Sequence, residues 1–353
     1  MVEPRRMAAV TAGPTARGAA RPRRTLWRDR RRALGGLALH RAVVGVPMLA
    51  GLSGLVFLLA DRSPFDPLAA HLGARYQQVS AEQRESLSGA LGFDAPWWQA
   101  WWAWVGDLLR GDLGWSRVYA MPVSEVFAER LPWTLLLSGT ALAGAVLAAL
   151  LLGTAAGLAP GGALDRAVTR TGVLVQAVPP FVLALGSVTV FAVLLRWAPV
   201  AGAAEPGEPH TAAGVARHLV LPAVTLALTQ LPWALLAVRT AVARATGSEA
   251  VRAARARGLT PARVVAAHVL PVSLAPLATI VGARLPELVV GAVLVEEVFA
   301  WPGLAGAVVG SAQALDFPLL AALTVATTAV VLVGSLLADA AYLLLDPRVG
   351  TDA

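Results

Sequence analysis

The polar stretch from Glu249 to Pro271, EAVRAARARGLTPARVVAAHVLP, interrupts a chain that is otherwise dominated by alanine, leucine and valine. Its arginines are Arg252, Arg255, Arg257 and Arg263. A guanidinium group keeps its charge at all working pH values, so it suits ion pairing with a partner better than proton transfer. The stretch therefore indicates recognition by something outside the membrane.

Other residue types that carry chemistry occur without the spacing that chemistry requires. The chain has no cysteine, so it has neither disulfides nor thiolate metal sites. Its histidines are scattered: His40, His71, His210, His218 and His268. Only His210 and His218 could come together, and solvated loop histidines are the favoured interpretation of that pair. The membrane-embedded serines lack a nearby base. We expect no catalytic residue, no metal and no cofactor.

The chain contains no lysine, and all its basic residues except histidine are arginines. A phosphate-binding loop of the G-x-x-x-x-G-K-[ST] type needs a lysine to reach the terminal phosphates of ATP. If ATP drives the function of this protein, another polypeptide must hydrolyse it.

Composition indicates a multi-pass membrane protein. Hydrophobic residues make up 57% and charged residues 14% of 353 residues, and the apolar positions form long blocks. A helix needs about 20 apolar residues to cross the bilayer, and only helices or closed barrels satisfy their backbone there. Six helical spans are predicted near residues 42–60, 133–158, 171–195, 219–238, 274–295 and 317–345. The first is expected to be an uncleaved anchor rather than a signal peptide.

The arginines predict the orientation of these spans. Twenty lie on the side of both termini and the 249–271 stretch, and eight lie on the other side. By the positive-inside rule, both termini face the cytoplasm of a cell whose plasma or inner membrane holds the protein. The net charge of +7 could suggest nucleic acid. Because the basic arm abuts a span, topology and contact with anionic membrane lipid are the favoured roles, and no nucleic-acid partner is expected. The arm is expected to be disordered to about Thr25.

Local signals predict a short surface helix in the polar stretch. Ser248 can cap a helix whose first turn carries Glu249, and Gly258 supplies a stop. Thr260 and Pro261 indicate a second start. The short helix would present a small-residue surface that a partner's groove could approach closely. That surface would consist of Ala250, Ala253, Ala254 and Ala256.

The pattern Arg252-Ala253-Ala254-x-x-x-Gly258, followed after nine residues by His268-x-Leu270-Pro271, resembles a known loop. It is similar to the EAA loop of permease subunits of ATP-binding-cassette importers, in the version of the oligopeptide, dipeptide and nickel branch. The resemblance implies a coupling helix that inserts into an ATPase subunit. The residues implied in that contact are Glu249, Arg252, Ala253, Ala254, Arg255, Arg257, Gly258, Leu270 and Pro271.

Further segments carry the resemblance from about residue 42 to 348. They resemble the family's GDLGxS, WPGL, DYP and DPR patterns, through Gly111, Asp112, Gly114, Pro302, Gly303, Asp316, Asp346, Pro347 and Arg348. Ala250 stands where the family usually has tyrosine, which affects the expected choice or affinity of the ATPase. Smaller departures are Ala253, Ala305 and Ser335.

The resemblance implies an all-α membrane protein of six transmembrane helices with the type I importer permease fold. The implied organisation is an arm (1–41), a permease domain (42–348) with an external segment (61–132) and a coupling loop (239–273), and a tail (349–353). The implied partners are two ATPase subunits, a second permease in a heterodimer, and an extracytoplasmic solute-binding protein. The implied solutes are peptides or related small molecules such as nickel chelates, and ATP hydrolysis would reside on the separate ATPase.

Arg284 and Glu287 are charged residues within a predicted span. Three residues apart, they can share one helix face and form an ion pair at a depth where an unpaired charge is costly. Two interpretations are equally open: the pair lines the solute path, or it only lowers the cost of insertion. Prolines within the spans would allow bends where a pathway opens.

The external segment is rich in tryptophan. Trp97, Trp98, Trp101 and Trp102 recur at helical spacing and predict a short helix with one aromatic face. A helix lying in the outer headgroups is the favoured interpretation. A docking surface for the solute-binding protein is the alternative.

Two other classes of function are open. An ion-coupled secondary transporter needs carboxylates near mid-membrane, and the spans offer little beyond Glu287. A purely structural or signalling protein would tolerate scrambling of residues 249–258. We therefore predict a permease subunit of an ATP-driven importer, with the secondary transporter as the alternative.

Overall fold

The structure, a computed structural model, describes residues 23–63, 67–90 and 95–345. Nearly all regular structure within these ranges is helical, with one hairpin of two two-residue strands at the end of the bundle that we call external, after the side predicted for it from the arginines. In chain order the elements are α1 (Arg23–Asp61), α2 (Pro67–Leu72), the 3₁₀ helix η1 (Gly73–Gln78), α3 (Ala81–Ala90), α4 (Trp97–Leu109), β1 (Trp115–Ser116), β2 (Met121–Pro122), α5 (Val123–Leu158), α6 (Ala163–Ala177), α7 (Pro180–Ser187), the π-helix η2 (Val188–Leu194), α8 (Ala212–Thr246), α9 (Glu249–Ala256), α10 (Pro261–Val264), the π-helix η3 (Val265–Val269), α11 (Leu270–Val298), α12 (Leu304–Gln313) and α13 (Phe317–Leu345).

Five straight helical segments among the described residues are long and apolar enough to cross a membrane. They are Leu34–Asp61, Val123–Leu158, Ala212–Thr246, Pro261–Leu285 and Phe317–Leu337. A sixth span is obtained if the bent pair Ala163–Ala177 and Pro180–Leu194 counts as one. The all-α fold predicted from the sequence is confirmed, the five or six candidate spans include the predicted number, and several spans are longer than predicted.

The third span is a correction. A straight helix was expected over 171–195, whereas α6 and the α7–η2 segment meet at an angle of 102°. The break falls at Val178, which precedes Pro179 and Pro180 and has an extended backbone at its position (φ −92°, ψ 124°). A residue before proline is pushed out of the helical region, and two successive prolines remove two helical N–H donors. The sequence analysis predicted that both prolines lie within one straight span. In the structure they separate it into two helical segments.

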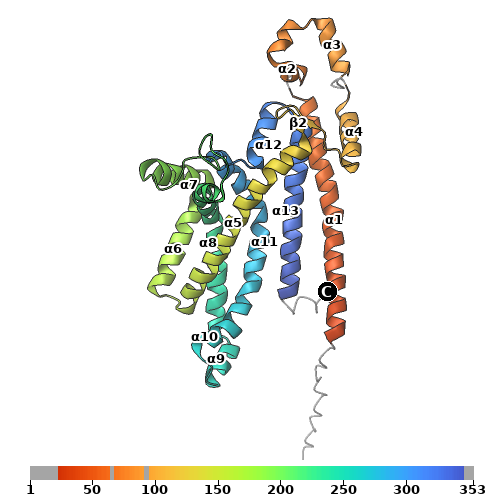
Figure 1. Cartoon of the computed structure of the whole chain (residues 1–353). Helices are drawn as coiled ribbons and strands as arrows, with labels where there is room; N and C mark the ends of the chain where they lie inside the picture. Colours follow the sequence, from red (N-terminus) through yellow and green to blue (C-terminus); the bar gives the residue numbers. More distant parts are fainter. Residues whose placement is uncertain (1–22, 64–66, 91–94, 346–353) are drawn as a thin grey trace, which may run out of the picture.

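The helices that cross the membrane form a bundle in which α8 is central. It packs against α5, α6, α7 and α11, while α13 packs against α11 and α1 (Figure 1). Arg41, near the middle of α1, pairs with Asp339 in the last third of α13 at 2.5 Å. The start of α1, the end of α13 and the helices α9 and α10 all lie at one end of the bundle (Figure 1).

α5 and α8 approach each other closely because glycines line the contact. A Cβ atom at Gly157 would lie 2.7 Å from the Arg239 carbonyl oxygen and 2.7 Å from the Val242 Cβ. One turn away, a Cβ at Gly153 would lie 2.9 Å from the Leu235 carbonyl oxygen. Small residues spaced four apart let the backbones of two membrane helices approach closely. Such close packing matters in a bilayer, because lipid tails are as apolar as the helices and no hydrophobic effect drives the helices together. The GTAAG segment therefore determines how α5 meets α8.

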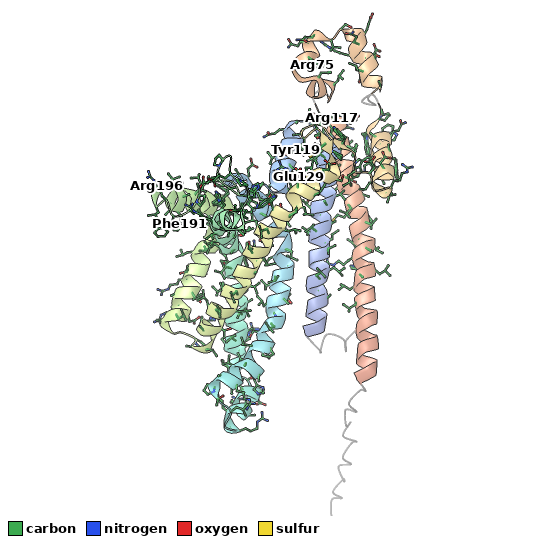
Figure 2. The ribbon with its side chains drawn as sticks, viewed as in Figure 1. Arg75, Arg117, Tyr119, Glu129, Phe191 and Arg196 are labelled. Carbon is green, nitrogen blue, oxygen red and sulfur yellow. The ribbon has the colours of Figure 1, made fainter. Side chains whose placement is uncertain are left out.

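The opposite end of the bundle carries the external segment. This segment contains the short helices α2, η1, α3 and α4 and the antiparallel hairpin β1–β2, and α12 lies at the same end of the bundle (Figure 1). Arg117 and Tyr119 in the hairpin lie at the same end as Arg75 of η1 (Figure 2). A buried cluster that includes Phe57, Trp104, Val123 and Leu319 joins this end to the spans.

The tryptophan-rich helix was predicted correctly, but the prediction that only one of its faces is aromatic was wrong. In α4, Trp98 and Trp102 are exposed, whereas Trp101 donates a hydrogen bond from Nε1 to the Ser53 hydroxyl of α1 at 3.0 Å. Trp104 is buried against Phe57, with ring centroids 5.7 Å apart. Two faces of α4 are therefore aromatic: one packs on α1 and the other is outward-facing.

Candidate functional site: the coupling loop and the external motif cluster

The stretch that opened the sequence analysis forms a protrusion at one end of the bundle. After α8 ends at Thr246, the chain makes a tight connection into α9 and then into α10 (Figure 1). Arg252, Arg255 and Arg257 are exposed, and the single ion pair within α9, between Arg252 and Glu249, is 3.4 Å long on the surface. An exposed pair of this kind contributes little to stability. The charges are therefore free to meet a partner.

Capping and a left-handed glycine fix the limits of α9, as predicted. The Ser248 hydroxyl accepts a hydrogen bond from the Val251 amide, and Glu249 occupies the first turn. Gly258 has φ +76°, a conformation that L-residues with side chains rarely adopt. The chain therefore reverses sharply at Gly258.

Only part of the predicted small-residue surface is available to a partner. Ala250, Ala253 and Ala256 are exposed, but Ala254 is fully buried together with Val251. Both pack in a cluster with residues of α8 and α10. Because positions 251 and 254 are three apart, they share the inner face of α9. Ala254 therefore anchors α9 on the bundle, and its side chain is not part of the exposed small-residue surface.

The second helix start was half correct. Pro261 occupies the first helical position of α10, but the Thr260 side chain makes no capping hydrogen bond. The helix then loosens into the π-turn η3 before Pro271. A proline cannot donate to the carbonyl four residues earlier, and π-turns are one way to accommodate that loss. Leu270 is half-buried and Pro271 exposed at the base of the protrusion.

Removing the cap of α9 is expected to have a local effect. We expect Ser248→Ala to destabilise the helix by about 1 kcal/mol. Hydrogen–deuterium exchange at the amides of residues 250–252 should accelerate, while exchange in α8 stays unchanged, because Val251 and Ala254 still anchor the helix. Ser248→Asp, which keeps an acceptor at the cap, should exchange like the wild type. Unchanged exchange in Ser248→Ala would contradict a capping role.

At the external end, Asp316 joins two of the predicted family motifs. Its side chain is fully buried and its Oδ2 accepts hydrogen bonds from the Ser116 hydroxyl (2.8 Å) and from the amides of Arg117 (2.7 Å) and Val118 (3.2 Å). Its Oδ1 also faces the Leu319 amide in the first turn of α13 at 3.5 Å. One carboxylate thus fastens the β1–β2 hairpin to the start of α13.

The glycines of the GDLGWS segment shape the turn that delivers Ser116. Gly111 and Gly114 have φ +87° and +85°, and the exposed Asp112 accepts a hydrogen bond from the Gly114 amide at 2.8 Å. Glycine adopts such angles without steric cost. These three predicted motif residues therefore act through backbone shape, and Ser116 makes the contact.

A second connection ties the WPGL segment to α5. The Glu296 carboxylate accepts from the Ala305 amide at 2.8 Å, and Arg130 donates to the Gly303 carbonyl at 3.1 Å. A Cβ at Gly303 would lie only 2.3 Å from the Glu296 carboxylate, so any larger residue there would displace that side chain. Pro302 is half-buried beside it. Asp346, Pro347 and Arg348 lie outside the described residues.

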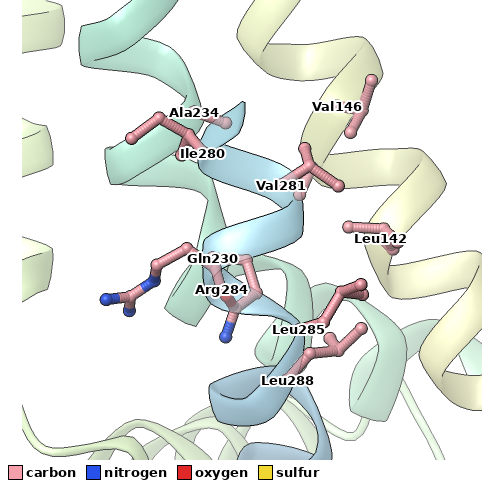
Figure 3. Close-up of a pocket in the computed structure, with 10 residues that line it drawn as sticks. Leu142, Val146, Gln230, Ala234, Ile280, Val281, Arg284, Leu285 and Leu288 are labelled. Carbon is pink, nitrogen blue, oxygen red and sulfur yellow. The ribbon is translucent and has the colours of Figure 1, made fainter. Parts of the chain in front are cut away.

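Arg284 and Glu287 form the predicted ion pair on one face of α11. The Arg284 guanidinium also stacks over the Trp233 ring of α8, with its carbon 4.3 Å from the ring centroid. Figure 3 shows Arg284 beside Gln230, at a contact of α8 and α11 with α5.

Sequence reasoning missed an ion pair near the coupling end. Asp165 in the first turn of α6 accepts two hydrogen bonds from Arg239 of α8, at 2.7 and 2.6 Å, and one from the Gly161 amide at 2.7 Å. This bidentate geometry ties the α5–α6 turn to the helix that leads into α9. No local pattern links residues 74 positions apart, so only the fold could reveal the pair.

Comparison with known proteins supplies the family. The family of binding-protein-dependent transport system inner membrane components matches residues 149–351, more than half of the chain. The chain belongs to this family. These permeases have the type I fold of ATP-binding-cassette importers, which is the fold that the sequence resemblance implied.

The chain aligns with known permeases over nearly their whole length. The chain is 31% identical over 312 residues to a putative peptide permease protein of Brucella suis, covering 88% of this chain and 98% of the relative. It shows the same identity and coverage with the oligopeptide transport system permease protein AppB of Bacillus subtilis. It is 27% identical over 334 residues to the dipeptide transport system permease protein DppB of Escherichia coli, covering 88% and 97%.

As a member of this family, the protein is a multi-pass permease subunit that forms a solute translocation pathway in the inner membrane. It works with a solute-binding protein, and ATP hydrolysis belongs to a separate ATPase subunit rather than to this chain. These relatives give no support to the ion-coupled secondary transporter that the sequence left open.

Proposed function

We propose that this permease imports peptides and that α9 (Glu249–Ala256), with the turn that follows it to Gly258, is the coupling helix that docks into an ATPase subunit. The single observation that carries the coupling role is the protruding helix with an anchored inner face and an outer face of arginines and alanines. The relatives, named as peptide, oligopeptide and dipeptide permeases, support peptides as the solute class. Nickel chelates stay an alternative solute of the same branch.

The complex that we propose contains two ATPase subunits, a second permease in a heterodimer and an external solute-binding protein. Closure of the ATPases would push on α9, and the push would reach α8 through their tight connection and α6 through the Asp165–Arg239 pair. Packed helices move as discrete bodies, so such a push can rock the spans between two states. The arginine distribution supports placing this end, with both termini, in the cytoplasm.

Co-purification of the ATPase subunits in detergent tests the coupling role. We expect Ala253→Glu to abolish ATPase binding, because Ala253 is exposed on the outer face of α9 and glutamate adds bulk and opposite charge among the arginines. Loss of more than tenfold of the bound ATPase is expected, since interface centres tolerate such changes poorly.

A matched alanine-to-glutamate change controls for general damage. Ala312→Glu alters an exposed alanine of α12 at the external end and should retain the ATPase. Equal retention in wild type and Ala253→Glu, with both monodisperse, would refute α9 as the docking site. Failure of the wild type to hold any ATPase would refute the same assignment.

A further inference from the structure

A cavity of about 270 Å³ lies beside the midpoint of α11, between α7, α8 and α11. Its polar lining consists of Thr229, Gln230, Arg284 and Glu287, with Pro180 and Gly291 among the apolar remainder. Arg284 is fourteen residues from either end of α11, hence roughly 20 Å along the helix from each. The cavity therefore lies near the middle of α11 along its axis, next to the proline break between α6 and α7.

Two polar atoms in this lining are buried without a hydrogen-bond partner among the described residues. They are the Gln230 Oε1, an acceptor, and the Arg284 Nε, a donor. Gln230 is only 7% exposed, and its amide nitrogen already donates to the Thr229 hydroxyl at 3.1 Å. Buried polar atoms are normally paired, so an unpaired acceptor beside an unpaired donor indicates a ligand that supplies both. A peptide group carries one N–H donor and one C=O acceptor.

The charged part of the lining is poised to exchange its partners. The Arg284–Glu287 pair spans three residues of one helix, and the Glu287 side chain is 55% exposed while that of Arg284 is 20% exposed. A pair of this kind is weak, so separating it costs little if each member gains another partner. Stacking on Trp233 holds the Arg284 guanidinium in place while its partner changes.

We propose that this cavity is a transit site for a short zwitterionic peptide. The ammonium end pairs with Glu287 and the carboxylate end pairs with Arg284. A rotation of the Gln230 and Arg284 side chains then presents their unpaired atoms, which are covered in this structure, to a peptide group. The site and the ligand are each neutral overall, so binding leaves no uncompensated charge at mid-membrane. The volume is near the lower end of ordinary ligand pockets, which matches a dipeptide. This inference rests on the proposed peptide import.

Direct binding to the importer without its solute-binding protein tests the site. The assembled permeases and ATPases are placed in lipid nanodiscs, and binding of radiolabelled alanyl-leucine is compared with that of N-acetyl-alanyl-leucine amide. We expect the wild type to prefer the free peptide at least tenfold. Glu287→Gln should reduce that preference to less than twofold, and Gln230→Leu should weaken both ligands about fivefold or more.

A matched control lies on the same helix. Glu297→Gln changes an exposed carboxylate of α11 outside the cavity, and it should keep the wild-type preference. Equal binding of free and blocked peptides by the wild type, binding of neither, or equal effects of Glu287→Gln and Glu297→Gln would each overturn the inference.

A separate measurement distinguishes this failure from failure of the proposed function. Uptake of alanyl-leucine is measured in proteoliposomes that hold the complete importer, with ATP and the solute-binding protein. Uptake without selective binding at the cavity refutes the transit site alone. Absence of uptake of any peptide refutes peptide import, and the transit site with it.

Discussion

Gly157→Val is expected to destabilise the protein strongly, by about 3 kcal/mol, or to prevent its recovery as a folded species. A Cβ at this position would lie 2.7 Å from both the Arg239 carbonyl oxygen and the Val242 Cβ, so α5 and α8 must separate. The contact involves backbone, which cannot turn aside as a flexible side chain would. The loss is measured as a fall in the midpoint of thermal unfolding in detergent.

The same helix offers a matched control for that change. Gly144 of α5 is exposed and a Cβ there would meet nothing within 4 Å, so Gly144→Val carries the same helix propensity without the clash. Its unfolding midpoint should stay close to that of the wild type. The unfolding midpoint of Gly157→Ala should lie between those of Gly144→Val and Gly157→Val. This variant keeps the comparison measurable if Gly157→Val does not fold. Equal midpoints for the variants at 144 and 157 would show that the helix contact is not tight.

Asp316→Ala is expected to release the external hairpin from α13. Removing the carboxylate leaves the Ser116 hydroxyl and the amides of Arg117 and Val118 without their acceptor, and each buried unpaired group costs about 1–3 kcal/mol. We expect a loss of about 3–5 kcal/mol in stability, since some groups will find water. Hydrogen exchange at the two amides should accelerate more than at any amide of α8.

Two substitutions separate this role from a general effect of charge. Asp316→Asn retains an oxygen acceptor and should lose less than half as much stability as the alanine variant. Asp112→Ala removes an exposed carboxylate of the GDLGWS segment that accepts a hydrogen bond only from within its own turn, and it should cost less than about 1 kcal/mol. If Asp112→Ala and Asp316→Ala were equally harmful, Asp316 would not be the connection between the hairpin and α13.

The residues that position the coupling loop show how far local sequence signals reach. Ser248, Gly258 and Pro261 act through bonds and dihedral angles within a few residues, so the limits of α9 and α10 could be predicted. The direction of the Ala254 side chain could not be predicted from sequence. Whether a residue of a short helix faces solvent or its own protein depends on the neighbouring helices. Here those neighbours are residues of α8 and α10.

The Arg284–Glu287 ion pair likewise combines a contact that is predictable from sequence with contacts that are not. Arg284 and Glu287 are three apart on one helix, so their pairing followed from helical spacing. The stacking on Trp233 and the approach of Gln230 come from another helix, and the cavity that they share exists only after α7, α8 and α11 pack. The proline pair at 179–180 was visible, but the 102° turn that it produces depends on what each half packs against.

The sequence by itself determined that this protein is a helical membrane permease with a basic, capped protrusion, because hydrophobic length, arginine distribution and capping are properties of contiguous residues. The tertiary structure decided which motif residues meet. Asp316 reaches Ser116 across 200 positions and Asp165 reaches Arg239 across 74. The glycines of α5 acquire their role only when α8 lies against them. Contacts between distant residues depend on how whole helices pack, and no local pattern encodes that packing.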